Sequence, residues 1–424
     1  MTLIFVVVAL LALLFCGLPV AFALAGLGTV MLFLKGLPLI MVAQNLHGAL
    51  DNFILLSVPL FLLMSNILLK GGVGKDLFDA LQSWVGHWPG GLGIAALASC
   101  GIFSAISGSS VATAATVATV AVPEMTSRGY GKSFTLGLLA AGGTLGILIP
   151  PSIPLIVYGV ITEESIGKLF LAGIGPGILL LVLFGLFTVA YSFFSKEYRP
   201  SAKIGAAERR RSTIRALPTG GLAILMIGGI YTGAFTPTEA SAVGAVFAFL
   251  ITAFVLRSLD RPGFVAAVRE TVSTTIVLFL IVIGAKIFGK AVTLYQVPAQ
   301  ISQIFDTQVQ SATVFLLIVG LILLFIGLFL ESLSMLLIMM PVLFPTVLAL
   351  GIDPIWFAMY FVILIEVALI TPPVGLNLFV IQAVARTNLG TVVRGVLPFI
   401  GLMFAALYLI WLFPVIVSFV PDNL

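Results

Sequence analysis

The sequence predicts an all-helical membrane protein with many crossings, built from two inverted repeats of about five crossings each plus a re-entrant hairpin in each repeat. Three observations support this fold class. The composition is that of a chain solvated by lipid, helix-breaking residues recur at a fixed spacing in the two halves, and positive charges gather in the loops on one predicted side of the membrane.

The composition places most of the chain in a bilayer. Of its 424 residues, 61% are hydrophobic and 8% are charged, against about 25% charged in soluble proteins. The mean hydropathy is +1.25. Uncharged apolar runs cover 3–15, 178–191 and 314–330, and a helix needs about 20 such residues to span a bilayer. A β-barrel would need short alternating strands, so the predicted spans are helices.

Helix-breaking residues repeat between the two halves of the chain. The alignment of the halves that places Pro123 on Pro345 also places the pair Pro150-Pro151 on Pro372-Pro373. A slightly smaller shift places Pro19 on Pro237. Such a recurrence in hydrophobic segments predicts an internal repeat, with interrupted helices at corresponding positions.

Each half is predicted to contain five crossings. The first repeat (1–195) has them at about 3–17, 19–34, 52–69, a broken helix over 133–160, and 168–194. A basic cytoplasmic linker (196–216) leads to the second repeat (217–424). There the crossings are at about 217–232, 238–256, 271–292, a broken helix over 354–384, and 391–419. Because the number per half is odd, the two repeats must have opposite orientations.

The distribution of Lys and Arg tests this topology independently, because cytoplasmic loops carry an excess of both. The loops on the opposite side hold only Lys35, Lys168 and Lys290, and both termini are predicted on that outer side. Sixteen residues lie on the inner side: Lys70, Lys75, Arg128, Lys132, Lys196, Arg199, Lys203, Arg209, Arg210, Arg211, Arg215, Arg257, Arg261, Arg269, Arg386 and Arg394. We interpret the three arginines at 209–211 as a signal for cytoplasmic orientation. The alternative interpretation is that they bind anionic lipid or a partner protein.

One apolar stretch in each half fits no simple crossing. The stretch at about 90–123 is too long for one span and short for two, and its centre, 107–110, reads Ser-Gly-Ser-Ser. Gly and Ser favour caps and turns, so a re-entrant hairpin is predicted there. The corresponding stretch at about 311–350 carries Glu331 and Ser332 at its centre. Taken alone, this second stretch is equally compatible with two full spans.

The paired prolines predict the chemistry of the broken helices. Pro150-Pro151 and Pro372-Pro373 lack N–H groups and leave carbonyls without helical partners. Such backbone is tolerated at membrane depth only inside protein or beside a cavity, and free carbonyls suit a hard cation such as Na⁺. The half-helix that follows presents a positive dipole end to an anion. A simple kink is the alternative for either pair alone.

Other side chains limit the kinds of ligand and reaction that the sequence supports. Hydroxyls at the hairpin tips, without imidazole or thiolate, suit Na⁺ better than a transition metal, although an ordinary turn is the alternative. His47 and His87 lie near opposite membrane faces, and no phosphate-binding loop or nucleic-acid partner is indicated. Lys286 and Glu366 are ionisable residues within predicted spans, which are functional candidates by default, and their roles stay open.

These segments resemble the large membrane subunit of the TRAP (tripartite ATP-independent periplasmic) transporters. The resemblance lies in 107–113, 142–152, 366–378 and 228–240, which includes Phe-Thr-Pro-Thr-Glu-Ala. It implies a Na⁺-driven permease of a bacterial inner membrane with an elevator mechanism, in which a transport domain slides against a scaffold domain. It also implies three partners beside the lipid bilayer: an organic acid anion, a periplasmic substrate-binding protein, and a small four-helix membrane subunit, expected here as a separate chain.

The resemblance also implies site residues. One Na⁺ site would use Ser107, Gly108, Ser110, Gly143, Thr144 and Pro150. The other would use Glu331, Ser334, Thr371, Pro373 and Gly375. The anion, a C4-dicarboxylate or a sialic acid, would lie near Ser109, Ser152, Ser332 and Asn377. Glu331 departs from the Asp more usual in this family.

Two other functions are compatible with parts of this pattern. A stand-alone Na⁺-coupled dicarboxylate symporter would use the same fold without a binding protein. An intramembrane serine protease would use Ser109 or Ser110, but it needs a general base beside that serine, and neither histidine is well placed. No enzymatic activity, organic cofactor or transition metal is therefore expected.

Overall fold

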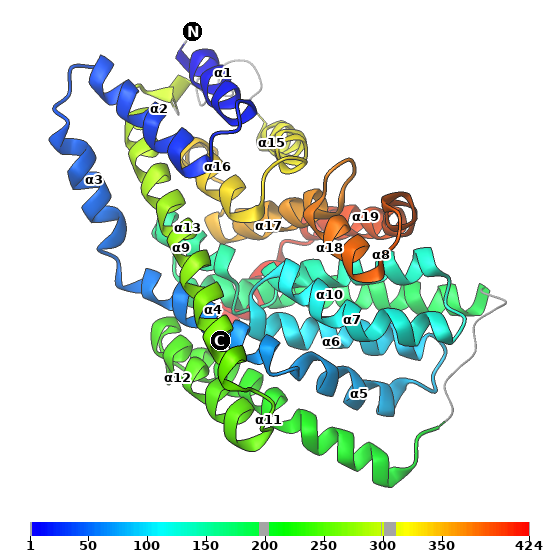
Figure 1. Cartoon of the computed structure of the whole chain (residues 1–424). Coiled ribbons are helices and arrows are strands. Elements are labelled where there is room, and N and C mark those ends of the chain that lie inside the picture. Colours follow the sequence, from blue (N-terminus) through cyan, green and yellow to red (C-terminus); the bar gives the residue numbers. More distant parts are fainter. Residues whose placement is uncertain (1, 195–202, 298, 301–310, 424) are drawn as a thin grey trace.

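A computed structural model describes residues 2–194, 203–297, 299–300 and 311–423, and it is helical with no strand among these residues (Figure 1). The first half contains α1 (Thr2–Phe15), α2 (Val20–Leu34), α3 (Ile40–Leu50), η1 (Phe53–Leu56), α4 (Ser57–Lys70), α5 (Val73–Val85), α6 (Gly91–Ser107), α7 (Ser110–Ser127), α8 (Lys132–Thr144), η2 (Leu145–Ile147), α9 (Ile153–Thr162) and α10 (Ile166–Phe194). The second half contains α11 (Ala206–Tyr231), α12 (Pro237–Leu250), η3 (Ile251–Val255), α13 (Arg261–Leu294), α15 (Ala312–Gly327), α16 (Ser332–Ala349), α17 (Pro354–Ile370), α18 (Leu376–Ala385), α19 (Leu389–Leu412) and α20 (Val415–Asn423).

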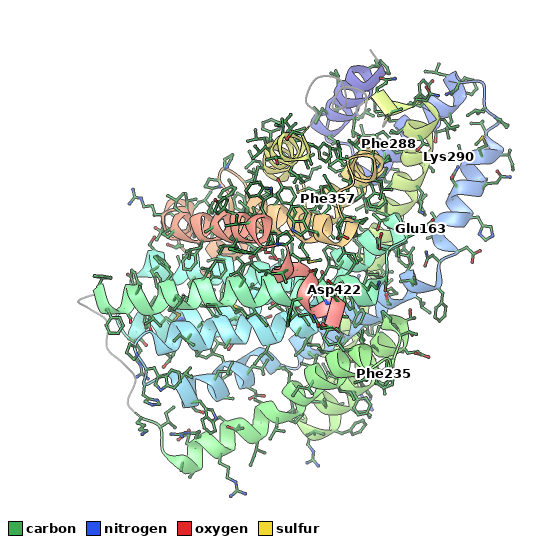
Figure 2. The ribbon with its side chains drawn as sticks, turned by 180° about the vertical axis from the view of Figure 1, so that it is seen from behind. Glu163, Phe235, Phe288, Lys290, Phe357 and Asp422 are labelled. Atoms are coloured by element: carbon green, nitrogen blue, oxygen red, sulfur yellow. The ribbon has the colours of Figure 1, made fainter. Side chains whose placement is uncertain are left out.

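The helices confirm an all-helical membrane protein. Within the described ranges, seven helical segments are long and apolar enough to cross a bilayer. Shorter apolar helices, among them α6, α9, α15, α17 and α18, lie in the segments predicted as hairpins and broken helices. One of the seven long segments, α16, lies there as well. The charged residues labelled in Figure 2 lie near helix ends and are exposed: Glu163 caps α9, and Asp422 lies in α20.

Two boundaries differ from the sequence-based topology. The last part of the predicted linker, 206–216, is already helical and belongs to α11. The predicted final crossing, 391–419, ends at Leu412, and a separate helix, α20, follows it. The early start of α11 has a tertiary cause: the Arg209 guanidinium lies 4.9 Å from the centre of the Trp84 ring, and Trp84 Nε1 donates to Thr213 Oγ1 at 3.0 Å.

Helices of the first half pack directly on helices of the second. The long helix α13 lies just inside α3 in Figure 1, with α2 packed against it, while α4 packs against α12. Glycines permit the approach of α2 and α13. A Cβ built on Gly28 would lie 2.9 Å from the Phe288 backbone, and one built on Gly284 would lie 2.5 Å from Ala21 O.

The two predicted hairpins pack against the two interrupted helices. The helices α6 and α7 pair as one hairpin, and α15 and α16 as the other. The first hairpin packs through α7 against α18, which follows the second break, and the second hairpin packs through α16 against α9, which follows the first break. Each hairpin therefore contacts the interrupted helix of the other half of the sequence.

The crossing of α8 and α19 gives a stability prediction. A Cβ built on Gly395 would lie 1.8 Å from Ser133 O, so Gly395→Ala must push the two helices apart. Overpacking of this kind costs about 1–3 kcal/mol, and we expect a lower unfolding temperature in detergent and less folded protein. Gly401→Ala in the same helix is the matched control, because nothing lies within 4 Å of its added Cβ. Equal stability of the two variants would contradict this packing.

Candidate functional site

The first hairpin turns at its polar tip. Gly108 adopts φ +60°, a left-handed conformation that favours glycine, and Ser109 caps α7 through its Oγ, 3.4 Å from Ala112 N. Ser107 Oγ lies 2.8 Å from Thr113 Oγ1, and Thr113 Oγ1 donates to Ser109 O at 2.8 Å. The turn thus gathers hydroxyl and carbonyl oxygens from both arms of the hairpin.

Thr113 is a member of this cluster that sequence reasoning did not single out. Its side chain is fully buried. The available signal was its spacing, since a threonine four residues after Ser109 on a helix can donate back to that residue's carbonyl. Threonines on a helix commonly make such bonds without any ligand, so the spacing alone did not indicate a site.

The hairpin tip sits directly on the first broken helix. A Cβ built on Gly108 would lie 2.8 Å from Pro151 O, and one on Gly146 would lie 2.5 Å from Ser109 O. A Cβ on Gly143 would lie 2.5 Å from the Ala114 Cβ. The structure therefore brings the tip and the break, which the sequence places in separate segments, into backbone contact.

Every residue named for the first site lies at this contact and is buried. Ser107 is 1%, Ser110 3% and Thr144 0% exposed. Thr144 Oγ1 donates to Ala141 O at 2.7 Å, and Ser152 Oγ donates to Ile147 O at 2.5 Å while also capping α9. The six residues of this first group are Ser107, Gly108, Ser110, Gly143, Thr144 and Pro150.

The residues named for the second site are more open. Glu331 caps α16, and its Oε1 accepts hydrogen bonds from Ser334 N and Ser334 Oγ, each at 3.1 Å. Glu331 and Ser332 are half-buried, Ser334 is buried, and Pro373 is exposed. Thr371 Oγ1 donates to Val367 O at 2.6 Å. Among the described residues, no hydrogen bond joins the pair Glu331–Ser334 to the break at 371–375.

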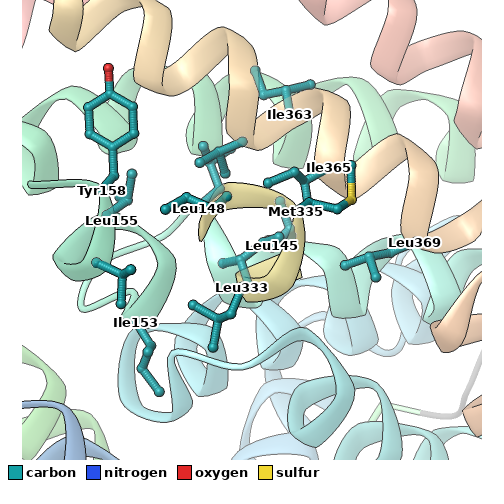
Figure 3. Close-up of a cluster of buried hydrophobic side chains, with 14 of the residues drawn as sticks. Leu145, Leu148, Ile153, Leu155, Tyr158, Leu333, Met335, Ile363, Ile365 and Leu369 are labelled. Carbon is teal, nitrogen blue, oxygen red and sulfur yellow. The ribbon is translucent and has the colours of Figure 1, made fainter. Parts of the chain in front are cut away.

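Apolar side chains pack the second hairpin against the break in the first interrupted helix. Figure 3 shows Leu333 and Met335 of α16 beside Leu145 and Leu148 of the break, with Ile153 of α9 nearby. All five are buried, with exposures of 8% or less. The tip of the second hairpin is thus held by packing, while its polar face, Glu331 and Ser332, stays partly exposed.

One side-chain amide joins the two halves at the candidate site with two hydrogen bonds, the longer of which reaches Ala140 O at 3.4 Å. Asn377, in the first turn of α18, donates from Nδ2 to Ser110 Oγ at 2.6 Å. The Asn377 side chain is fully buried, and its Oδ1 has no hydrogen-bond partner in the described part of the chain. A residue named for the anion therefore touches a residue named for the first cation site.

The donor set narrows the ions that could bind. The described residues contain no group of three or more His, Cys, Asp or Glu side chains placed to hold a metal ion. The first group offers hydroxyl and backbone carbonyl oxygens, which are ligands for hard cations with oxygen coordination. The arrangement fits a weakly held alkali cation better than zinc or iron.

Comparison with known proteins assigns the family. The model of the family described as "Tripartite ATP-independent periplasmic transporter, DctM component" matches residues 7–416. The chain is 37% identical over 414 residues to the sialic acid TRAP transporter large permease protein SiaM of Vibrio cholerae, covering 97% of this chain and 96% of that protein. It is 39% identical over 381 residues to the C4-dicarboxylate TRAP transporter large permease protein DctM of Pseudomonas aeruginosa, covering 90% and 89%.

Solved structures show the same fold at low sequence identity. The YdaH transporter of Alcanivorax borkumensis superimposes with a TM-score of 0.61 at 15% identity, over 88% of this chain and 87% of that one. Its crystal structure is described as having an unusual topology. The MtrF efflux pump of Neisseria gonorrhoeae gives a TM-score of 0.54 at 14% identity, over 88% and 83%.

The relatives exclude one of the sequence-based alternatives. They are named as permease subunits of transporters, so the chain is not an enzyme and the protease interpretation of Ser109 and Ser110 is wrong. The match to the family model and the identity to full-length relatives extend over nearly the whole chain. This chain belongs to the DctM family, the large permease component of tripartite ATP-independent periplasmic transporters.

Proposed function

We propose that this chain imports an organic acid anion across the inner membrane, driven by a Na⁺ gradient. The observation that carries the proposal is the contact of the hairpin tip with the Pro150-Pro151 break, closed from the other half by Asn377. That contact gathers buried hydroxyls and backbone carbonyls, which favour a hard cation that binds weakly enough to be released.

The proposed mechanism is of the elevator type. The two hairpins and the two broken helices would form the moving transport domain, and α2, α4, α12 and α13 would belong to the scaffold. The reciprocal packing supports two inverted repeats: α2 on α13 matches α12 on α4, and α7 on α18 matches α16 on α9. In the proposed topology both termini are periplasmic.

Two Na⁺ sites are proposed at equivalent places in the repeats. The first uses the buried group at the α6–α7 tip and the Pro150 break, with Thr113 added to it as a further hydroxyl. The second uses Glu331 and Ser334 with the backbone around Thr371, Pro373 and Gly375. To bind a cation at the second site, the Glu331 carboxylate would have to give up its hydrogen bonds to Ser334 N and Ser334 Oγ.

The anion is proposed to lie between the two cation sites. In this proposal Ser109 and Ser152 of the first half and Ser332 and Asn377 of the second half would contact the anion. Na⁺ binding at the tips would order them and raise the affinity for the anion, and the anion would raise the Na⁺ affinity by the same factor. The relatives are named for sialic acid and for C4-dicarboxylates, so these two classes are the proposed substrates.

The proposed assembly contains two further proteins. A periplasmic substrate-binding protein would deliver the anion, and a small membrane subunit on a separate chain would complete the permease. In this arrangement the binding protein performs most of the substrate selection.

Uptake into proteoliposomes tests the function. Vesicles holding this chain and its small subunit receive a binding protein with N-acetylneuraminate or succinate, and the Na⁺ gradient is imposed or abolished. We expect uptake only with the binding protein and only with the gradient. Uptake indifferent to Na⁺ would contradict the coupling, and uptake without the binding protein would favour the stand-alone symporter.

A further inference from the structure

Glu366 is a carboxyl group that the proposed ion and anion sites leave unused. It lies in α17, shortly before Thr371, and its side chain is fully buried. Neither Oε1 nor Oε2 has a hydrogen-bond partner in the described part of the chain. Ionising a fully buried carboxyl that no described group donates to costs far more than an ordinary hydrogen bond returns, because the charge loses its hydration on burial.

The position of Glu366 within its helix also disfavours a negative charge. The last turn of α17 begins directly after it, and the free carbonyls of a helix C-terminus carry partial negative charge. The helix ends at Ile370, since the following prolines supply no N–H groups to these carbonyls. A carboxylate at 366 would therefore lie about one turn from a second negative centre, which raises the cost of ionising it.

No ion pair involves Glu366 in the described part of the chain. Within the described residues, the two ion pairs are Lys70–Glu270 and Arg128–Glu124, and both lie outside α17 and the helices packed on it, α8 to α10, η2, α15, α16 and α18 to α20. Tyr360 donates to Leu316 O, and Tyr158 donates to Pro354 O at the far end of α17. The other titratable groups on or capping these helices are Lys132, Glu163, Lys168, Tyr191, Glu331, Asp353, Arg386, Arg394, Tyr408 and Asp422.

The equivalent position in the first repeat is occupied by a neutral side chain. The alignment that superimposes the two proline pairs also places Glu366 on Thr144, a neutral side chain that donates its hydroxyl proton to Ala141 O at 2.7 Å. A protonated carboxyl can make the same kind of donation, and a carboxylate cannot, because it only accepts. The two repeats then share a neutral donor just before each break.

We propose that Glu366 is a proton-binding site of the transport domain, and that the bound proton moves with the anion as a further coupling cation beside Na⁺. The coupling part rests on the transport function proposed above, whereas the protonation of Glu366 does not. This site differs from the two Na⁺ sites in its donor set: a single carboxyl in an apolar interior suits H⁺, which needs one oxygen, and not a metal ion, which needs several.

Infrared spectroscopy of the purified protein tests the protonation directly. A protonated carboxyl has a C=O stretching band that a carboxylate lacks. We expect this band in the wild type at neutral pH and its loss in Glu366→Gln, with Glu366→Thr as a second variant that copies the first repeat. Glu239→Gln, at an exposed carboxyl in the first turn of α12, should leave the band in place. A wild-type spectrum that matches Glu366→Gln in this region would overturn the proposal.

Proton movement tests the coupling. Proteoliposomes of the full assembly enclose a pH-sensitive dye and receive N-acetylneuraminate or succinate outside. We expect the lumen to acidify during wild-type uptake, and the ratio of protons to anions to fall to zero in Glu366→Gln. An unchanged ratio in this variant, or no acidification in the wild type, would overturn the coupling. If neither anion enters, the substrate proposal fails, and the infrared band still decides whether Glu366 holds a proton.

Discussion

Replacing Asn377 by Ala is expected to reduce anion uptake by roughly 5-fold to 150-fold without loss of the folded protein. The Asn377 amide is the one described side chain that hydrogen-bonds across the two halves at the candidate site, through Ser110 Oγ at 2.6 Å. Its removal leaves a buried hydroxyl without this donor, which costs about 1–3 kcal/mol and corresponds to that range of binding constants.

The measurement is initial uptake in proteoliposomes as a function of both anion and Na⁺ concentration. Because Ser110 belongs to the proposed cation group and Asn377 to the proposed anion group, the variant should raise the half-saturating concentrations of both. A rise for the anion alone would place Asn377 outside the cation site. Gln382→Ala in the same helix, α18, is the control, because Gln382 is half-buried and makes no side-chain bond to the first half among the hydrogen bonds described.

The interrupted helices could be read from the sequence because their cause is local. Two adjacent prolines cannot continue a regular helix, so a break near each pair was expected. Helix α17 ends at Ile370, two residues before Pro372, whereas α8 already ends at Thr144, six residues before Pro150. The turn of the first hairpin was predictable for the same reason, since Gly108 takes a left-handed conformation that the Ser-Gly-Ser-Ser sequence allows. Local chemistry thus determined that each helix is interrupted near its proline pair, although not the residue at which it ends.

The features that depend on tertiary contact could not be predicted. The helix α11 begins within the expected linker because Arg209 and Thr213 contact Trp84 on α5, in a distant part of the sequence. The Asn377–Ser110 bond joins residues 267 positions apart, and only the docking of the two halves creates it. Thr113 was missed because its bond to Ser109 O resembles any threonine back-bond on a helix.

The asymmetry of the two candidate cation sites is a further result that needed the structure. Equivalent positions in the two repeats offered no reason to expect one site buried and the other open. The first is closed by α18 through Asn377, while in the second Glu331 is engaged as the cap of its own helix. The two sites therefore should not bind Na⁺ with equal affinity in this conformation.

Removing the hydroxyl pair at the first tip is the second change with a large expected effect. Ser107→Ala and Thr113→Val each delete one partner of the 2.8 Å bond between Ser107 Oγ and Thr113 Oγ1. If both hydroxyls face the same cation, each loss should raise the half-saturating Na⁺ concentration about tenfold, since about 1.4 kcal/mol corresponds to a factor of ten. The anion affinity at saturating Na⁺ should change far less.

The double variant separates a shared site from two independent contacts. Residues that act on one ion are not additive, so Ser107→Ala with Thr113→Val should cost less than the sum of the two single changes. Thr119→Val is the matched control on α7, because Thr119 is exposed and its hydroxyl donates only to Thr116 O in its own helix. If the effects of the two single changes add, or if the Na⁺ dependence equals that of the control, the first cation site does not include the Ser107–Thr113 pair. A non-additive loss confined to Na⁺ activation would instead tie cation binding to the hydroxyls that hold the hairpin tip in its turn.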